Sequence, residues 1–566
     1  MKTWKVKTLN PENLPNLPEM PGLIVRLLAL RGLTAPAQIN DFLNPDYNKL
    51  YDPFLFKDMQ KGVERIKLAI DRKEKITIYA DYDADAITAC AVTYLTLQKL
   101  GANVDHYIPD RFSEGYGINE EAIKKIAENG SKLIITVDCG INANAGALVC
   151  KNLGMDLIIT DHHEVTGELP EALAIINPKN PSDNYPFPYL TGVGVAFKLV
   201  QGLASRFQTS DSKFSLPLGF EKWLLDLVAI GTVADIQSIS DENRILVSFG
   251  LKVMAKTRMV GLKILLDKAG VKNPPDAFTL GFIVAPRINA AGRIAHANTA
   301  FELLVTADSE KAEKLSEELD NLNRHRQNLT EQIMSEAKSQ LELVKDKKVL
   351  LAVGSDWPKG IVGLVAGKLA EEYRKPVLAI STSSDGLAVG SARSVAGFDI
   401  VEALKHAKDL LQKYGGHTQA AGFSLMAKDL EDFHLKLLDY ADQVNLALAE
   451  PLIEADAEVT PMDITWENLE YLEKMAPWGY GNPKPKFMGS DFEVLDVRLV
   501  GAQSQHLKLK VRYGEHRLPA IAFNQGFLAT QIKWGSHLDA IFELGSNTWN
   551  GNKEIELKFY DIKLKI

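Results

Sequence analysis

The chain has 566 residues, which at roughly 150 residues per domain predicts three or four domains and excludes a single small core. Hydrophobic residues make up 46% and charged residues 24%, which excludes a largely disordered or collagen-like polymer. The formal net charge of −9, from 64 Lys and Arg against 73 Asp and Glu, excludes a globally basic surface. A nucleic-acid partner would therefore need a local basic patch.

The first fifty residues are rich in Pro and Leu, and we expect residues 1–50 to form an N-terminal extension packed on the body. From Lys75 onward, short apolar runs alternate with longer helical patterns. Apolar strands that are bounded by Gly and spaced by helices predict a parallel, doubly wound sheet in a domain over residues 51–306.

The segment Ser309–Lys345 has neither Pro nor Gly and carries an apolar stripe, which predicts one long helix over about 307–346. Such a helix is expected to bridge two lobes. After it the α/β pattern restarts, which predicts a second α/β domain over 347–450. Beyond Glu454, short alternating strands separated by turn residues predict a small antiparallel barrel over 451–566. The expected fold is thus two α/β lobes joined by a long helix, plus a C-terminal β-barrel.

Cysteine usage and the chain start favour a cytoplasmic protein. Cys90, Cys139 and Cys150 are too few to staple a chain of this length, and they lack the paired spacing of a metal ribbon. The first residues contain no continuous apolar stretch with a small-residue cleavage site, and no run approaches the ~18 apolar residues of a membrane helix. We expect neither secretion nor membrane spanning.

Three carboxylates, Asp81, Asp83 and Asp85, alternate just after the apolar strand Lys75–Tyr79 and precede a helix expected to begin near Ala86. Open α/β sheets bind ligands at this edge, and crowded carboxylates repel one another unless cations share them. A metal site is one interpretation. A solvated acidic turn that caps the helix is the alternative.

The next strands favour the metal site. Asp138 follows the strand "KLIITV", and Asp161, His162 and His163 follow the strand "MDLIIT", so in a parallel sheet these groups would meet at one edge. Asp235 is a further acidic candidate, because it ends the otherwise apolar run "LLDLVAIGTVA". Carboxylates with one or two imidazoles suit Mn²⁺ or Mg²⁺ better than a thiolate-dominated zinc site. A capped loop is the alternative for the His pair.

The segments "DYDADAIT", "VDCG", "DHH" and "GTVAD", in this order, resemble the four motifs of the DHH phosphoesterase superfamily. Within it, further segments resemble the RecJ family of single-strand-specific 5′→3′ DNA exonucleases: "PDRFSEGYG", "LTGVGVAFKL", "PRINAAGR", "GIVGLVAGKLAE", "GSARS", "YGGHTQAAGFS" and "PWGYGNPKPKF". The resemblance runs from about Lys75 almost to the C-terminus. It implies a DHH catalytic domain, a DHH-associated domain and an OB-fold.

Carried over by resemblance, the metal ligands are Asp83, Asp85, Asp138, His162 and Asp235, with Asp81 and His163 in or beside the ligand set. Two Mn²⁺ or Mg²⁺ ions would clamp the scissile phosphate and activate water, with Asp138 as the bridging ligand. His163 is expected either to orient the water or to fix His162. The sequence departs from the family at Ala86, where Gly is usual, and at Tyr79, where some members have His.

The segment "YGGHTQAAGFS" combines paired glycines with what we interpret as a helix start. Gly415 and Gly416 would let the backbone approach phosphate, and His417 would donate to it from the helix N-terminus. An ordinary glycine turn is the alternative. By resemblance this segment faces the metals, so His417 joins Asp81, Asp138 and His163 as a candidate catalytic residue.

Arg111, Arg287, Arg293 and Arg393 each lie among Gly, Ser or small residues, and not on an amphipathic helix face as we interpret the pattern. Guanidinium groups beside open backbone suit bidentate phosphate binding, and a surface ion pair is the alternative for each. By resemblance, Arg111, Ser391 and Arg393 receive the 5′-terminal phosphate. Arg287 and Arg293 steer the backbone that enters the site.

An OB-fold holds a single strand with a basic groove and stacked aromatics, and core packing is the alternative for each aromatic. The candidates are Trp478, Tyr480, Lys484, Lys486, Phe487, His506, Lys508, Lys510 and Arg512. The resemblance implies a monomeric exonuclease that releases 5′-mononucleotides in recombination and repair, beside a single-strand-binding protein and a helicase. A superfamily phosphatase acting on pyrophosphate, a short oligonucleotide or a cyclic dinucleotide would lack the barrel and bridging helix. A non-catalytic scaffold would lack the metal ligands.

Overall fold

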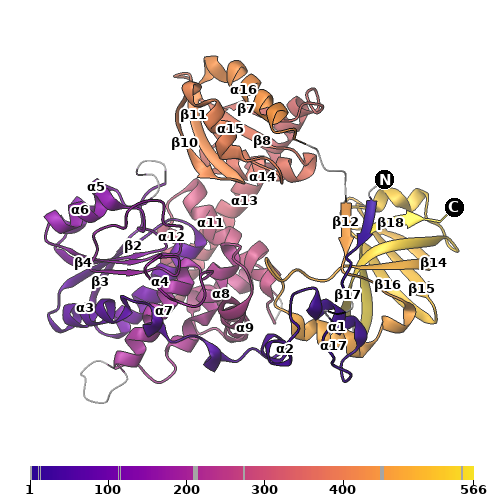
Figure 1. Cartoon of the computed structure of the whole chain (residues 1–566), viewed down its shortest axis with the longest axis horizontal. Coiled ribbons are helices and arrows are strands. Elements are labelled where there is room, and N and C mark those ends of the chain that lie inside the picture. Colours follow the sequence, from indigo (N-terminus) through magenta and orange to yellow (C-terminus); the bar gives the residue numbers. More distant parts are fainter. Residues whose placement is uncertain are drawn as a thin grey trace.

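The computed structural model describes residues 3–10, 12, 14–111, 114, 117–207, 215–271, 274–446, 452–549 and 552–565. Two α/β lobes, a long helix that connects them and a C-terminal β-barrel make up the molecule (Figure 1), so the expected fold class is confirmed. Among the helices that these residues form, none is long and apolar enough to cross a bilayer.

The first lobe contains a parallel sheet with the strand order β3-β2-β4-β5-β6. Its strands are β2 (Lys75–Ala80), β3 (Asn103–Tyr107), β4 (Ser131–Val137), β5 (Asp156–Thr160) and β6 (Ala174–Ile176). One face packs on α3 (Met59–Asp71), α4 (Ala84–Lys99) and α7 (Gly192–Phe207), and the other on α5 (Glu120–Glu128) and α6 (Asn144–Asn152). The chain leaves β2 toward β3 and returns to β4 on the other side, which makes the β2–β4 edge the switch point where such sheets bind ligands.

Helices complete the first lobe and lead into the long connecting helix. They are α8 (Leu225–Ala234), α9 (Asp241–Met254), α10 (Val260–Lys268), the π-helix η5 (Thr279–Val284), α11 (Ala285–Ile294), α12 (Asn298–Val305) and α13 (Ser309–Leu341). The expectation that Arg287 and Arg293 lie off a helix is wrong, because both are on α11. Pro286 in the first turn of α11 made the helix hard to recognise.

The second lobe has a mixed sheet with the order β10-β11-β9-β8-β7, in which only β7 and β8 are parallel. Its elements are β7 (Leu350–Ser355), α14 (Lys359–Tyr373), β8 (Val377–Thr382), β9 (Leu387–Arg393), α15 (Ile400–His406), β10 (Leu411–His417), β11 (Ala420–Met426) and α16 (Leu430–Gln443). The expected helix start after His417 is wrong, because β10 and β11 form a hairpin there. The small residues of this segment allow the close strand pairing.

The barrel closes through pairing of β14 with β17. Its elements are β12 (Leu452–Ala455), β13 (Ala457–Glu458), α17 (Trp466–Met475), β14 (Phe487–Val500), β15 (His506–Tyr513), β16 (His516–Ala522), β17 (His537–Trp549) and β18 (Asn552–Leu564). Single turns are η2 (Tyr47–Lys49), η3 (Pro53–Leu55), η4 (Glu221–Leu224), η6 (Lys408–Leu410), η7 (Ala427–Asp429), η8 (Pro461–Asp463) and η9 (Gly526–Thr530).

The N-terminal extension shares the core of the barrel. The strand β1 (Thr3–Val6) pairs in parallel with β12, and Figure 1 shows the N-terminus beside the barrel. The apolar faces of α1 (Gly22–Ala29) and α2 (Pro36–Leu43) pack into the same hydrophobic cluster as the barrel strands. The extension and the barrel are therefore one packing unit.

Arg244 of α9 joins the first lobe to this unit. Its buried guanidinium donates to the carbonyl oxygens of Phe42, Lys474 and Ala476 at 2.8–3.1 Å. Close by, the Ile239 N–H donates to the Tyr480 carbonyl oxygen at 2.8 Å. Hydrogen bonds from one buried cation to carbonyls of two segments, α2 and the end of α17, fix the lobe and the barrel unit relative to each other.

Candidate active site

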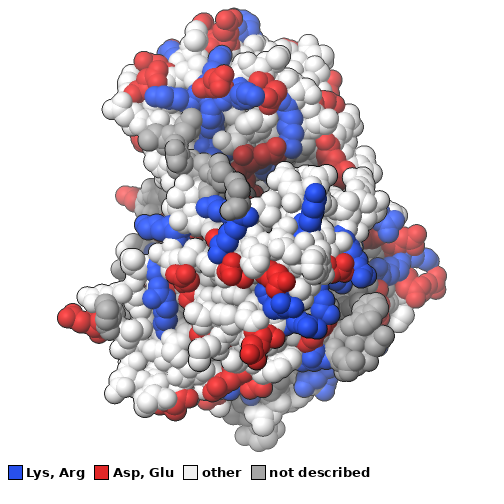
Figure 2. Space-filling model, turned by 90° about the vertical axis from the view of Figure 1, so that its right-hand side faces the viewer, with Lys and Arg blue, Asp and Glu red and all other residues white. Residues whose placement is uncertain are grey.

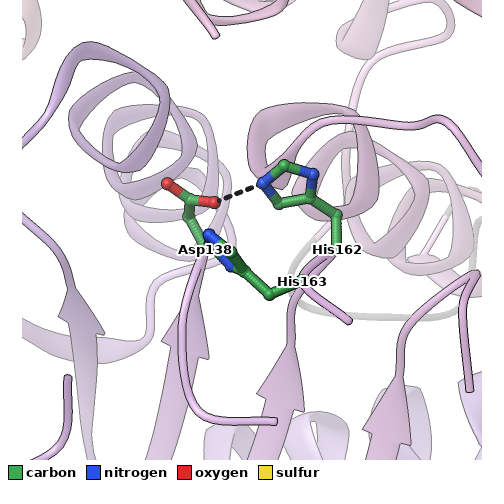
Figure 3. Close-up of side chains that lie close together, drawn as sticks. All are labelled: Asp138, His162 and His163. Carbon is green, nitrogen blue, oxygen red and sulfur yellow. Dashed lines mark ion pairs between the residues drawn. The ribbon is translucent and has the colours of Figure 1, made fainter. Parts of the chain in front are cut away.

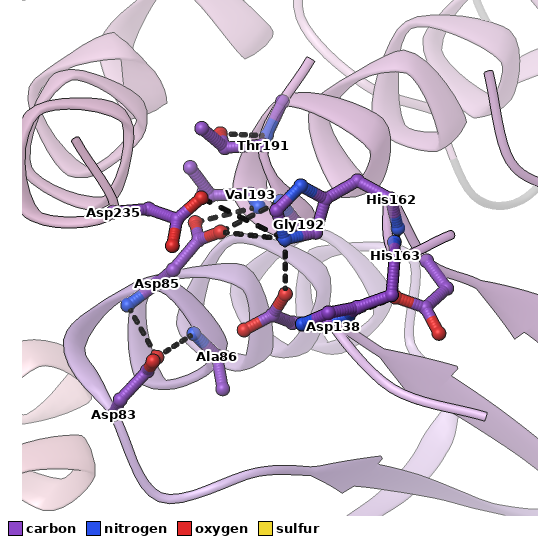
Figure 4. A network of polar contacts seen from close by, with 12 residues as sticks. Asp83, Asp85, Ala86, Asp138, His162, His163, Thr191, Gly192, Val193 and Asp235 are labelled. Atoms are coloured by element: carbon purple, nitrogen blue, oxygen red, sulfur yellow. Dashed lines mark hydrogen bonds and ion pairs between the residues drawn. The ribbon is translucent and has the colours of Figure 1, made fainter. Parts of the chain in front are cut away.

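The seven predicted ligands and ligand neighbours lie together at the carboxyl edge of the first sheet. The strand β4 pairs with both β2 and β5, so side chains that follow these strands are neighbours. They are Asp81 and Asp83 after β2, Asp85 in the first turn of α4, Asp138 after β4, His162 and His163 after β5, and Asp235 at the end of α8. Figure 4 shows all of these except Asp81.

His162 lies at the centre of this group. Its Nε2 is 3.0 Å from Asp138 Oδ1, 3.7 Å from Asp235 Oδ2 and 3.9 Å from Asp85 Oδ2. Figure 3 shows the approach of Asp138 and His162, with His163 beside them. The nearest ligand atoms of Asp138, His162 and His163 lie within 4.8 Å of one another, and so do those of Asp85, His162 and Asp235. Either set can hold a metal ion.

The first residues of α7 hold Asp85 in place. The backbone N–H groups of Gly192 and Val193 donate to its two carboxylate oxygens at 2.7 and 2.9 Å. A carboxylate is favoured at a helix N-terminus, where backbone N–H groups have no helical acceptor. A Cβ added to Gly192 would lie 2.4 Å from the Asp138 side chain, so a side chain at this position would displace Asp138. Sequence reasoning did not single out Gly192, although the "LTGVG" segment contains it.

Asp83 is the N-cap of α4, which begins at Ala84. Its Oδ1 accepts hydrogen bonds from the N–H groups of Asp85 and Ala86. The hydrogen bond from Ala86 to Asp83 uses the backbone N–H, which alanine has as glycine does. The methyl group of Ala86 is fully buried in the core. Asn289 of α11, another residue that sequence reasoning missed, accepts a hydrogen bond from the Ala84 N–H at 2.8 Å.

Asp161 orients a histidine. Its Oδ2 accepts from the Ile141 N–H, and its Oδ1 lies 2.7 Å from Nδ1 of His163. A carboxylate on one imidazole nitrogen fixes the ring and leaves the other nitrogen for a ligand. Tyr79 takes no part in the ligand set, because its hydroxyl donates to the Gly117 carbonyl oxygen.

Burial and mutual repulsion shape the electrostatics of the centre. They raise the pKa of Asp85 and Asp138 well above the ordinary range, that of Asp81 to about 7 and that of Asp235 to about 6. Burial and the neighbouring His163 lower the pKa of His162 to about 3, so its imidazole is neutral and available as a ligand. Repelling carboxylates of this kind need a compensating positive charge.

The donor set fits a divalent cation. Asp81 Oδ1 and Asp235 Oδ2 are buried, and no described residue forms a hydrogen bond with either, although such oxygens are costly to leave unpaired. The thiol of the buried Cys139 donates a hydrogen bond to the Tyr79 carbonyl oxygen. Oxygen ligands with a neutral imidazole suit Mn²⁺ or Mg²⁺.

Four arginines gather beside the carboxylates. Arg293 is largely buried, and its burial together with the nearby Arg111, Arg326 and Arg393 lowers its pKa to about 10. These side chains come from a loop, α11, α13 and β9, and Arg293 Nη1 donates to the Gly360 carbonyl oxygen at 3.2 Å. Guanidinium groups collected from four segments have the charge and geometry to bind an anion such as phosphate.

Arg326 was not predicted from the sequence. On the charged helix α13 it resembles any solvent-facing cation, and helical periodicity gives no signal for it. In the structure, its Nε and Nη2 donate to Oδ1 of the buried Asn323 at 3.2 and 2.9 Å. This contact holds the guanidinium on the side of α13 that packs against α11.

Arg111 and Arg287 differ in their surroundings. The Arg111 guanidinium lies 4.8 Å from the ring centroid of Tyr82, which follows Asp81, so it is beside the metal centre. The neighbours of Arg111 in its motif, Phe112, Ser113, Gly115 and Tyr116, are outside the described residues. Arg287 instead pairs with Asp320 of α13 at 2.9 Å. Its proposed steering of the DNA backbone stays a prediction.

On the second lobe, Arg393 Nη1 donates to Ser391 Oγ at 2.9 Å, beneath the start of α14. His417 is exposed at the end of β10, and no hydrogen bond or ion pair joins its side chain to a described residue of the first lobe. Gly416 is required by the hairpin, because a Cβ there would lie 2.3 Å from the Ala420 carbonyl oxygen. A Cβ on Gly415 meets nothing within 4 Å. The phosphate roles of all three stay predictions.

The barrel candidates divide between surface and core. Phe487 is buried, Trp478 is half-buried under Arg31, and Tyr480 is exposed. Lys508, Lys510 and Arg512 lie exposed along β15, whereas Lys484 pairs with Glu543. Figure 2 shows Lys and Arg interspersed with Asp and Glu among the atoms visible on the barrel side. The positive charges on this face therefore lie in small groups and do not form one large basic patch.

Comparison with known proteins gives three domain matches: the N-terminal domain of the DHH family over residues 75–232, the DHHA1 domain over 346–442 and the RecJ OB domain over 455–561. The chain is 40% identical to the single-stranded-DNA-specific exonuclease RecJ of Bacillus subtilis (strain 168), over 99% of this chain and 70% of that relative. The structure is similar to crystal structures of RecJ from Thermus thermophilus in complex with Mn²⁺ (TM-score 0.83, 28% identity, 99% and 79% of the two chains) and with Mg²⁺ (TM-score 0.75, 27%, 99% and 78%).

Proposed function

The chain belongs to the RecJ family of single-stranded-DNA-specific exonucleases, and from this premise we propose that it degrades single-stranded DNA from the 5′ end and releases 5′-mononucleotides. It is a Mn²⁺- or Mg²⁺-dependent phosphodiesterase that serves DNA recombination and repair. The observation that carries this function is the convergence of five elements, β2, α4, β4, β5 and α8, on one carboxylate and histidine cluster beside an arginine cluster.

The residues that would hold the cations are Asp83, Asp85, Asp138, His162 and Asp235, with Asp138 at the end of the middle strand β4 and Asp81 beside them. Bound divalent cations supply Lewis-acid chemistry, because they neutralise charge on the phosphodiester and activate water. The His163 ring, oriented by Asp161, holds or moves a proton at its Nε2. The backbone N–H groups in the first turn of α7 favour the charged form of Asp85, against the burial that raises its pKa, and they direct the carboxylate at the cluster.

The arginine cluster accounts for the 5′→3′ direction. Arg111, Arg293, Arg326 and Arg393, with Ser391, receive the 5′-terminal phosphate, while His417 and the Gly415–Gly416 backbone contact phosphate from the second lobe. A terminal phosphate carries more negative charge than an internal one, so it gains most from several guanidinium groups. Because this cluster is next to the carboxylates, the bond nearest the 5′ end is the one presented for cleavage.

The barrel binds the part of the DNA strand that follows the 5′ end, through local cations and exposed aromatic side chains. We further propose that the enzyme acts as a cytoplasmic monomer, together with a single-strand-binding protein and a helicase that deliver unpaired DNA. The free cysteines Cys90, Cys139 and Cys150 are all buried, which is compatible with a reducing compartment.

One assay tests the function. Single and double strands carrying a 5′ or a 3′ label are incubated with the protein and Mn²⁺, Mg²⁺ or a chelator. We expect the 5′ label to appear first as a mononucleotide, the 3′-labelled strand to shorten progressively, and chelator to stop both. Equal attack on double strands, or internal cuts, would contradict the proposal. Strand binding without any hydrolysis would support the scaffold alternative.

A further inference from the structure

Two phenylalanines form an exposed stacked pair on the first lobe. The rings of Phe278 and Phe282 lie 4.7 Å apart with an interplanar angle of 20°, and the two residues are 60% and 71% exposed. Single exposed apolar residues are ordinary, but two aromatic rings stacked on each other in water form an apolar patch that calls for a partner. Nothing described so far gives this pair a role.

The pair is held by an unusual helical turn. Phe278 immediately precedes the π-helix η5, Phe282 lies within it, and η5 runs directly into α11. Pro286 has no N–H to donate to the carbonyl of residue 282, and its ring clashes with that turn, which favours the wider π geometry. Short π segments occur often at functional sites.

Arg287 clamps this turn to the connecting helix. Its Nη1 donates to the Ile283 carbonyl oxygen at 2.8 Å, and its Nε and Nη2 lie 3.1 and 2.9 Å from Asp320 of α13. The rings of Phe278 and Phe282 are therefore attached to a backbone turn that contacts with α11 and α13 hold in place. This gives Arg287 a positioning role that does not require contact with DNA.

The turn also rests on the helix that carries a metal ligand. A Cβ on Gly281 would lie 3.4 Å from Val233 Cγ1, and Val233 precedes Asp235 by two residues on α8. Two further apolar or aromatic side chains are exposed beyond Asp235: Ile236 is 68% exposed, and Tyr480, whose carbonyl oxygen accepts a hydrogen bond from Ile239, is 66% exposed. In Figure 1, α8 and α9 lie on the side of the first lobe turned toward the barrel. The turn that carries the phenylalanine pair therefore packs against the helix that ends at the candidate ligand Asp235.

We propose that Phe278 and Phe282 form a stacking platform for unpaired bases of the strand held at the metal centre. This inference rests on the proposed function and adds a subsite to it. Flat parallel rings match the faces of nucleobases, and stacking of a base on an aromatic ring needs no particular sequence. The bases of a duplex already stack on one another and cannot insert here. The platform therefore selects for the single-stranded state by a contact to the base, whereas the arginine cluster contacts only phosphate.

The charge of the chain supports a base contact. The net charge is −9, and cations on the barrel side are mixed with acidic residues. Contacts to phosphate alone therefore give this surface a limited affinity for a polyanion. A partner protein would be the other occupant of an apolar patch, and the experiment below separates the two.

The test measures binding in chelator, so that it does not depend on hydrolysis. A 5′-phosphorylated 20-nucleotide strand is compared with a series in which a block of three abasic residues is moved along it. For the unaltered protein we expect about a tenfold loss of affinity at one block position, the size of a lost base–aromatic stack. A profile without any such position would overturn the proposal.

The variants assign that position to the pair. In Phe278→Ala/Phe282→Ala we expect about tenfold weaker binding of the natural strand and no further loss with the block at the sensitive position. Phe278→Tyr/Phe282→Tyr should restore the original profile, and Leu435→Ala, which removes an exposed apolar side chain from α16, should match the unaltered protein. An alanine variant that keeps the original affinity and profile would overturn the platform. Binding without hydrolysis in added Mn²⁺ would refute the proposed function and leave the platform standing.

Discussion

Asp138 is buried among Asp85, Asp83 and Asp235 and has a left-handed backbone with φ of 60°. We predict that Asp138→Asn, which keeps the size of the side chain, lowers kcat roughly a thousandfold or more, because it removes a charge that holds the cations. Affinity for a single strand in chelator should change little. Single-turnover hydrolysis and a binding titration measure the two effects, and near-normal turnover would contradict the two-metal assignment.

Asp226 is a buried carboxylate of α8 that serves no ligand role. Burial raises its pKa to about 6, although Thr257 Oγ1 donates to it at 2.6 Å. The unfolded chain loses this proton near pH 4, so between about pH 4 and 6 the folded state binds more protons. The free energy of unfolding therefore falls as pH rises through this window.

Asp226→Asn removes that dependence. Between pH 4 and pH 7 we predict that the stability of the variant relative to the unaltered protein improves by about 2–3 kcal/mol, from a shift of about two pKa units. Urea unfolding of both proteins at four pH values, at one fixed metal concentration, measures the difference. If the free energies of unfolding of the two proteins change with pH in parallel, the Asp226 carboxyl ionises in the folded state at little cost in free energy, and the prediction is wrong.

Arg326 gives the sharpest test of the terminal-phosphate site, because only the tertiary structure identifies it. We predict that Arg326→Ala reduces the preference for a 5′-phosphate over a 5′-hydroxyl by roughly ten- to a hundredfold, the value of one charge-assisted contact. Arg393→Ala should match it, and Arg111→Ala should have a smaller effect. The ratio of kcat/KM for the two substrates is the measurement.

The control lies on the same helix. Arg324 is exposed and pairs with Asp320, two residues from Arg326 in the chain and outside the arginine cluster. Arg324→Ala should leave the substrate ratio unchanged. If both variants lower it equally, general attraction of the strand to α13 explains the effect, and the terminal-phosphate site lies elsewhere.

At the scale of elements, the first turn of α7 organises the ligands. Gly192 donates to Asp85, and a methyl group at its Cα would meet Asp138 at 2.4 Å. We predict that Gly192→Ala weakens Mn²⁺ binding about ten- to a hundredfold, the usual effect of disturbing the support of a ligand. Isothermal titration with Mn²⁺ measures it. Gly167→Ala, where the added methyl group meets nothing within 4 Å, is the matched control, and equal affinities of the two variants would contradict the assignment.

At the scale of the whole molecule, the barrel and the N-terminal extension form one core. Removing residues 447–566 alone would expose the apolar faces of α1 and α2 and remove two of the carbonyl partners of Arg244. We therefore predict that a chain lacking both 1–44 and 447–566 is the soluble truncation. It should bind long single strands more weakly and with a smaller salt dependence, while it still hydrolyses short oligonucleotides.

Binding titrations of the full chain and the double truncation on one long oligonucleotide, across a salt series, measure this prediction. Equal affinities and equal slopes would exclude a strand-binding role for the barrel unit. Thermal unfolding of the truncated chain is the control, since a loss of binding counts only if the two lobes remain folded.

The sequence by itself determined the order of the lobes, the long helix and the group of carboxylates and histidines that meets at one edge of the first sheet. Apolar runs, the absence of Pro and Gly over α13, and carboxylates at strand ends are local features, and parallel strands bring their carboxyl ends to one edge by necessity. Only the tertiary structure placed Arg326 in the arginine cluster, put α1 and α2 in the barrel core, made the segment after His417 a hairpin and turned Asp161 toward His163. Each of these depends on which distant segment lies alongside or on how a side chain turns locally, and neither periodicity nor spacing along the chain encodes that choice.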